Sequence, residues 1–242
     1  MDIETTLSFG PDEYLTLPDD KENPGEKDLL LIALEALHKK PGTGLRIVIL
    51  KKSIDARKKN RILLTFRVRI TDTKLEKEPI STAVPEIPEI NVRKRPVVVG
   101  FGPAGMFAAL LLSRQGYSPI VIERGNKIED RIRDVERYFG GEALLPYSNV
   151  QFGEGGAGTF SDGKLYSGVS DTRRTYVLDS FVRAGAPAEI LYASHPHVGT
   201  DRLRGVVTAI RREIESAGGT FLFGRTVNGI ETENGRVKGI RH

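Results

Sequence analysis

The chain has 242 residues, 39% of them hydrophobic, with a formal net charge of +4 at neutral pH. This composition excludes collagen-like, wholly disordered and polytopic membrane proteins, and the length suits one large domain or two ordinary ones. The absence of cysteine excludes disulfides, thiol catalysis and cysteine-held iron–sulfur clusters. No basic segment followed by an apolar run begins the sequence, so we expect a cytoplasmic protein without membrane association.

Residues 1–76 predict a small α+β domain. Residues 29–40 favour a helix that Asp28 caps and Pro41 and Gly42 end. Residues 45–50 and 61–70 have the composition of strands. Between them, residues 51–61 hold six basic side chains and one acid, and we expect a basic loop there.

Two further features organise this half of the chain. Residues 77–95 contain three prolines within ten residues and predict an extended linker between domains. The basic loop 51–61 lacks interleaved aromatic residues, so a solvated loop is the favoured reading and nucleic-acid binding is not expected. Docking of nucleic acid or an acidic partner through this loop is kept as an alternative function.

Residues 96–242 predict an α/β domain. The apolar run at residues 96–99 reads as a strand buried on both faces, as in parallel sheets. A helix over residues 104–115 and a second strand over residues 119–123 complete a βαβ unit. Further on, the sequence predicts a helix over residues 200–217, a strand over residues 220–223 and a hairpin around Asn234-Gly235.

A dinucleotide-binding motif joins the first strand to its helix. The segment Gly100-Phe101-Gly102-Pro103-Ala104-Gly105 matches G-x-G-x-x-G, and the acid Glu123 ends the next strand 18 residues later, against ~20 expected. Gly100 permits the tight turn, Gly102 lets a pyrophosphate approach the backbone, and Gly105 allows close packing of helix and strand. The helix N-terminus then faces the phosphates, and Glu123 can accept hydrogen bonds from ribose hydroxyls. An acid at the ribose disfavours NADP, while NAD and FAD both stay open.

A second glycine cluster occupies residues 151–165, QFGEGGAGTFSDGKL. So many glycines favour a backbone that wraps closely around a ligand. The N–H groups of Gly155, Gly156, Ala157 and Gly158 could form an anion-binding nest. Lys164 could neutralise a phosphate or contact a flavin carbonyl.

The chain resembles a bacterial family of uncharacterised FAD-dependent dehydrogenases, the NAD(P)/FAD-dependent oxidoreductases. The resemblance rests on VVVGFGPAGMFAALLLSRQGYSPIVIERG and SNVQFGEGGAGTFSDGKL, with supporting segments over nearly the whole length. It implies a Rossmann-type domain that transfers hydride through FAD, with NAD(P)H as a possible electron donor. The resemblance places FAD against the following residues: Gly100, Phe101, Gly102, Pro103, Ala104, Gly105, Glu123, Arg124, Gly155, Gly156, Gly158, Thr159, Phe160, Ser161, Asp162, Gly163 and Lys164. By analogy with related flavoproteins, the backbone of Val227 contacts the adenine.

Family members continue beyond the point that corresponds to His242, so we expect only the amino-terminal portion of the FAD domain here. An NAD-dependent dehydrogenase is the first rival function. His195 and His197 form an H-x-H pair, but no acidic cluster completes a ligand set and no metal site is predicted. No catalytic residue, substrate or oligomeric state is indicated.

Overall fold

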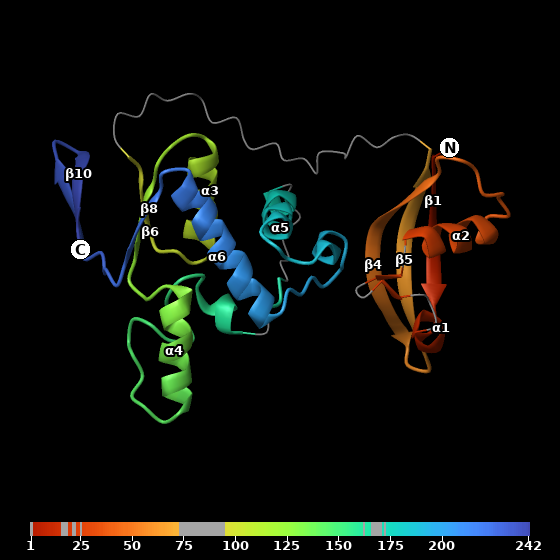
Figure 1. The fold of residues 1–242 in the computed structure, drawn as a ribbon, viewed down its shortest axis with the longest axis horizontal. Helices are drawn as coiled ribbons and strands as arrows, with labels where there is room; N and C mark the ends of the chain where they lie inside the picture. The colour runs from red at the N-terminus through yellow and green to blue at the C-terminus, as the bar shows by residue number, and fades with distance from the viewer. Residues whose placement is uncertain are drawn as a thin grey trace. The chain divides into compact units, whose positions relative to one another are not determined.

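The computed structural model describes residues 2–15, 19–20, 23–24, 26–72, 95–161, 163–165, 171 and 173–242. The predicted linker therefore lies outside the described residues except for Arg95, and so does Asp162. The chain forms two compact units (Figure 1), the first comprising Met1–Ile80 with Ala188–Pro196 and the second Ser81–Pro187 with His197–His242. No helix within the described ranges is long and apolar enough to cross a membrane.

The first unit is built on an antiparallel sheet covered by one helix. Its strand order is β1-β5-β4, with β1 (Asp2–Phe9), β4 (Arg46–Lys58) and β5 (Arg61–Thr71). The helix α2 (Glu26–Ala36) packs its Leu29 and Ala33 against Phe66, Val68 and Ile70, which alternation along β5 places on one face. The smaller elements are α1 (Pro11–Leu15), β2 (Asp19–Asp20), β3 (Asn23–Pro24) and the 3-10 turn η2 (Ala188–Leu191).

Helix α2 ends four residues earlier than the sequence predicts. His38 adopts a left-handed conformation with φ of 53°, and the N–H of Lys39 bonds to the carbonyl of Leu34 at 2.8 Å. Such a turn satisfies the last carbonyl groups of a helix. The chain therefore leaves the helix before Pro41 can stop it.

The prediction of a basic loop at residues 51–61 is wrong. Strand β4 continues to Lys58, and only Lys59 and Asn60 turn the chain into β5. The hydroxyl groups of Ser53 and Thr65 lie 2.8 Å apart across the two strands, and Arg57 pairs with Asp55 at 2.6 Å. Cross-strand bonds and a local ion pair thus hold a strand whose charge suggested a loop.

The second unit contains a parallel sheet in the order β6-β7-β8, so the protein is of the mixed α/β class. Its strands are β6 (Val97–Val99), β7 (Ile120–Glu123) and β8 (Thr220–Phe223). Helix α3 (Pro103–Arg114) joins β6 to β7 and lies next to α6 (Thr200–Ser216), as Figure 1 shows. The βαβ unit and the later helix and strand predicted from the sequence are confirmed.

Strand β6 is not buried on both faces as predicted. The side chains of Val97 and Val99 are 41% and 56% exposed, because within the described chain β6 is an edge strand that pairs only with β7. Val98 faces the opposite side, toward Gly105 of α3. The apolar run identified the strand correctly but not the exposure of one of its faces.

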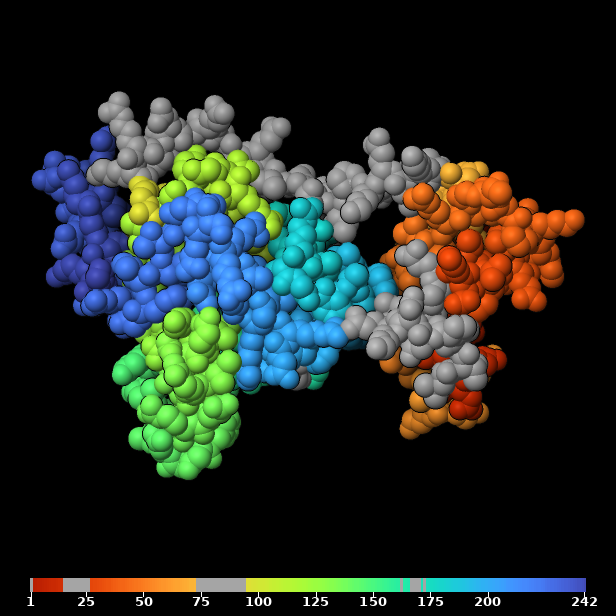
Figure 2. Space-filling model, viewed as in Figure 1, coloured from red at the N-terminus to blue at the C-terminus, as the bar shows by residue number. Residues whose placement is uncertain are grey.

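The remaining elements are α4 (Ile128–Phe139), the 3-10 turn η1 (Ala157–Phe160), α5 (Arg173–Arg183) and a hairpin of β9 (Gly229–Glu233) and β10 (Arg236–Arg241). Asn234 and Gly235 turn the hairpin with positive φ at both positions, as an Asn-Gly turn requires. Helix α4, which the sequence analysis did not assign, lies in a lobe beside α6 (green in Figure 2).

Candidate dinucleotide-binding site

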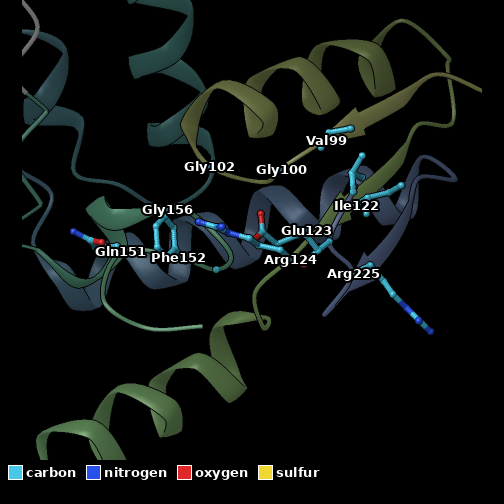
Figure 3. A pocket seen from close by; sticks show the side chains of 13 residues that line it. Val99, Gly100, Gly102, Ile122, Glu123, Arg124, Gln151, Phe152, Gly156 and Arg225 are labelled. Carbon is cyan, nitrogen blue, oxygen red and sulfur yellow. The ribbon is translucent and has the colours of Figure 1, made fainter. Parts of the chain in front are cut away.

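A cavity of about 440 Å³ opens at the carboxyl ends of β6, β7 and β8 (Figure 3). Ligands of open parallel sheets bind at this edge, and the volume lies within the ~300–1,000 Å³ of small-molecule pockets. The lining residues come from the ends of the three strands and from the second glycine cluster: Val99, Gly100, Gly102, Ile122, Glu123, Arg124, Gln151, Phe152, Gly153, Gly156, Arg225, Thr226 and Val227.

Three glycines of the first motif have different reasons to be glycine. Gly100 has a φ of 88°, which favours glycine, and its N–H bonds to the carbonyl of Ile122 at 2.8 Å. A Cβ on Gly105 would lie 1.9 Å from the carbonyl oxygen of Gly100, so the packing of α3 on β6 requires glycine there. A Cβ on Gly102 would meet no protein atom within 4 Å. Neither backbone conformation nor protein packing therefore requires glycine at position 102, which lies at the edge of the cavity with open space in front of it.

The rest of the motif shapes the start of α3. Gly102 is the N-cap residue and Pro103 occupies the first helical turn, where its missing N–H costs nothing. Phe101 is buried and packs edge-on against Phe221 at 4.8 Å, so its side chain supports the loop from the core. The ring of Phe101 thus packs into the core, while its backbone N–H and carbonyl are bonded to Glu123 and Gly155.

Glu123 braces the motif from the end of β7. The carboxylate is buried and accepts a hydrogen bond from the N–H of Phe101 at 2.7 Å and another from the N–H of Gly125 at 2.8 Å. One oxygen thus holds the G-x-G-x-x-G loop and the other holds the turn after β7. Each oxygen keeps a further lone pair, so a ribose hydroxyl could still donate to it.

One basic and one aromatic side chain, Arg124 and Phe152, form one wall of the cavity. The guanidinium carbon of Arg124 lies 3.7 Å from the ring centroid of Phe152, which is a stacked cation–π contact. Figure 3 shows Arg225 at the opposite rim, with its side chain directed away from the cavity. Thr226 and Val227 continue the rim of the cavity.

The second glycine cluster packs directly on the first. The N–H of Gly155 bonds to the carbonyl of Phe101 at 2.8 Å, and a Cβ on Gly156 would lie 3.1 Å from Cδ of Pro103. A Cβ on Gly125 would meet Cα of Gly153 at 2.4 Å. The two loops thus approach each other backbone to backbone.

Only part of this cluster lines the cavity. Gly156 does, whereas Thr159 is buried and bonds to the carbonyl of Glu154 at 3.4 Å. Beyond η1, the chain turns toward residues 197–200, where Lys164 forms a β-bridge with His197. The predicted ligand-contacting residues that the structure describes and that lie outside the lining are Phe101, Pro103, Ala104, Gly105, Gly155, Gly158, Thr159, Phe160, Ser161, Gly163 and Lys164.

A fully buried arginine, missed by the sequence analysis, organises the second cluster. Arg131 of α4 is 0% exposed and donates to the carbonyl groups of Asn149 at 2.9 Å, Val150 at 3.0 Å and Glu154 at 2.6 Å. Burial lowers the pKa of Arg131 to about 10, although Glu123 and Glu154 oppose the shift. The signal in the sequence is the apolar stripe of α4, in which Arg131 follows Ile128 by three residues.

Glu154 is also 0% exposed and ties three elements together. Its carboxylate accepts the N–H of Ile128 at 2.7 Å and Nε of Arg211 at 2.8 Å, and Arg211 also pairs with Glu129 at 2.6 Å. Burial raises the pKa of Glu154, while Ile128 and Arg211 oppose the shift. Helices α4 and α6 therefore hold the loop that faces the cavity.

The histidines of the H-x-H pair lie at the surface. His195 and His197 are both exposed. Within the described ranges, no three histidine, aspartate or glutamate side chains lie close enough together to hold a metal ion.

Among the known proteins to which the chain is similar, one is named as a monooxygenase, which is an oxidoreductase. Residues 14–71 match the family described as Domain of unknown function (DUF8436). An uncharacterised protein of Clostridium beijerinckii is 48% identical over 209 residues, which are 81% of this chain and 39% of that protein. The 6-methylpretetramide 4-monooxygenase of Streptomyces rimosus is 30% identical over 160 residues, which are 66% of this chain and 36% of the enzyme.

The chain thus spans less than two fifths of the length of these two relatives. Among solved structures, the crystal structure of Thermovibrio ammonificans THI4 is similar with a TM-score of 0.37 and 19% identity, covering 60% of this chain and 46% of that one.

Proposed function

We propose that the chain binds FAD in the cavity at the ends of β6, β7 and β8 and acts in flavin-dependent oxidoreduction. The observation that carries the proposal is the open space in front of Gly102, at the N-terminus of α3 and beside a cavity of about 440 Å³. Among the described residues, no protein atom near this position requires glycine there, whereas a pyrophosphate approaching the helix N-terminus would.

The other parts of the site fit the same cofactor. Glu123 retains acceptor capacity for a ribose hydroxyl, and the backbone around Val227 lines the rim where an adenine would lie. Gly156 presents backbone next to Pro103, so the second cluster could contact the phosphates together with α3. FAD, when bound, supplies the electron transfer, while the protein supplies position and electrostatics.

The sequence relatives support the same class, since one of them is named as a monooxygenase. Within this proposal, residues 96–242 without the segment 188–196 form part of a Rossmann-type FAD-binding domain. Residues 1–76, joined by residues 188–196, form a separate small unit. NAD(P)H is the proposed electron donor.

Titration of FAD and of NAD, each into the purified chain, tests the proposal by flavin absorption, flavin fluorescence and circular dichroism. We expect saturable FAD binding that Gly102→Val abolishes while the folded structure is retained. The branched side chain would occupy the cavity without clashing with a protein atom. Gly205→Ala is the matched control, since a Cβ at this position of α6 also meets open space, away from the cavity lining. Unchanged FAD affinity in Gly102→Val, or binding of NAD without FAD, would refute the proposal.

A further inference from the structure

The segment Ala188–Pro196 is bound to the edge strand β4 of the first unit. The N–H of Lys52 donates to the carbonyl of Tyr192 at 2.9 Å, and the N–H of Ser194 donates to the carbonyl of Lys52 at 2.9 Å. These bonds form a parallel bridge between Lys52 and Ala193. We call Ala188–Pro196 the strap. The domain limits predicted from the sequence include the strap in residues 96–242, whereas its contacts place it in the first unit. The sequence does not reveal this, because the strap pairs with residues far away along the chain.

The side chain of Lys52 closes the same contact. Its ammonium group is 2.6 Å from Oε1 of Glu189 and 3.4 Å from the hydroxyl of Tyr14, and the side chain is only 15% exposed. The rings of Tyr14 and Phe66 lie 5.6 and 5.7 Å from the ammonium, a cation–π arrangement. A lysine so largely withdrawn from water depends on its anionic partner. Loss of the Lys52–Glu189 pair should therefore loosen the strap.

The residues that directly follow the strap hold the second glycine cluster. The N–H of Val198 donates to the carbonyl of Gly163 at 3.0 Å, and the hydroxyl of Thr200 donates to the carbonyl of Ser161. A Cβ on Gly163 would meet the backbone of Gly199 at 2.8 Å, which shows how closely the two segments pack. Only His195 and Pro196 separate the contacts of Ser194 with β4 from those of residues 197–200 with the cluster.

We infer that the first unit regulates the cofactor site through this strap. Pairing of Lys52 with Glu189 stabilises Ser161, Gly163 and Lys164 at the end of the second glycine cluster, and through them the earlier part of that cluster, residues 151–156, which lines the cavity and would hold FAD. The inference rests on the proposed function for its FAD arm. Because coupling between two sites is reciprocal, FAD binding should in turn protect the strap. The role would explain why a small domain accompanies a dinucleotide-binding unit in one chain.

Hydrogen exchange by mass spectrometry and FAD titration test the inference in the full chain. Lys52→Met removes the charge and keeps the apolar stem, and Glu189→Gln removes the partner charge. Arg57→Gln is the matched control, since it breaks an exposed ion pair on the same strand, with Asp55, away from the strap. We expect both strap variants to speed exchange at residues 189–194 and also at residues 158–165, and to weaken FAD binding about fivefold or more. FAD should slow exchange at residues 189–194 in the unmodified chain.

The two arms separate failure of the inference from failure of the proposed function. If the unmodified chain binds no FAD, the proposed function fails, and faster exchange at residues 158–165 in the strap variants alone supports the coupling. If exchange rises only at residues 189–194, with residues 158–165 and FAD affinity unchanged, the strap is a structural contact and the inference is overturned. A double variant no weaker than either single variant would show that both substitutions break one interaction.

Discussion

Arg131 and Glu154 join helix α4 to the second glycine cluster through two hydrogen bonds, one donated by a side chain of the helix and one accepted by a side chain of the cluster. The guanidinium of Arg131 donates to the main-chain oxygen of Glu154 at 2.6 Å, while the Glu154 carboxylate accepts the N–H of Ile128 in the first turn of the same helix. Both side chains are fully buried. The conformation of the loop that faces the cavity is therefore fixed from behind, by two side chains that lie outside the cavity lining.

Arg131→Lys should destabilise the protein by about 3 kcal/mol, because a lysine lacks the planar fork that reaches three carbonyl groups and leaves buried acceptors unsatisfied. Urea unfolding followed by circular dichroism measures the change. Arg133→Lys serves as the control, since Arg133 is an exposed residue of α4 that pairs with Asp130, and it should change stability by less than ~0.5 kcal/mol. Equal stabilities of the two variants would contradict this account of Arg131.

Gly105→Ala should cost about 3 kcal/mol or more in stability, because its methyl group would lie 1.9 Å from the carbonyl oxygen of Gly100 and force α3 away from β6. Gly102→Ala should leave the unfolding free energy within ~0.5 kcal/mol of the unmodified protein, since no described protein atom lies within 4 Å of the added Cβ. Thermal and urea unfolding of the two variants check the contrast. Similar stabilities for both would disprove the packing argument.

Glu123→Gln should destabilise the loop by about 1–3 kcal/mol, since the amide can accept only one of the two backbone N–H groups and turns its own NH₂ toward the other. FAD affinity, where measurable, should fall as well. Glu136→Gln, at an exposed position of α4, is the control for the change in charge. A Glu123→Gln protein with unchanged stability would show that the brace contributes little.

Asp55 should titrate at about pH 2, well below its ordinary value of 3.8, because the side chain and then the backbone N–H of Arg57 hydrogen-bond its carboxylate. A pKa lowered by folding means that the stabilisation is present above pH 3.8 and is lost as the pH falls through about 2. Carbon-detected NMR titration reads the midpoint. Arg57→Gln should move it back toward 3.8, and a normal midpoint in the unmodified chain would contradict the pairing.

Local features of this chain could be predicted from the sequence, whereas non-local ones could not. The Gly100–Gly105 turn and the Asn234-Gly235 hairpin depend on backbone conformations that only certain residues adopt. The six basic residues at positions 51–61 predict a loop. The strand forms there because β4 pairs with β5 across the hairpin and Arg57 pairs with Asp55, and a count of charges reveals neither contact.

The buried residues around the site show the same limit. Arg131 would have been placed in solvent by its charge, since its three acceptors are carbonyl groups that carry no sequence signal. The position of Glu123 was foreseen, but its two bonds to backbone N–H groups follow from the fold of the turn. Pairing of the strap with β4 joins residues more than a hundred positions apart.

The exposed valines of β6 have a practical consequence for handling the protein. Val97 and Val99 lie on a strand that has one hydrogen-bonding edge without a neighbour among the described residues. Such an edge is a template onto which another strand can add, and apolar side chains beside it favour the addition. Val97→Lys should therefore reduce strand addition at this edge, which a comparison of concentration-dependent light scattering between the two proteins measures.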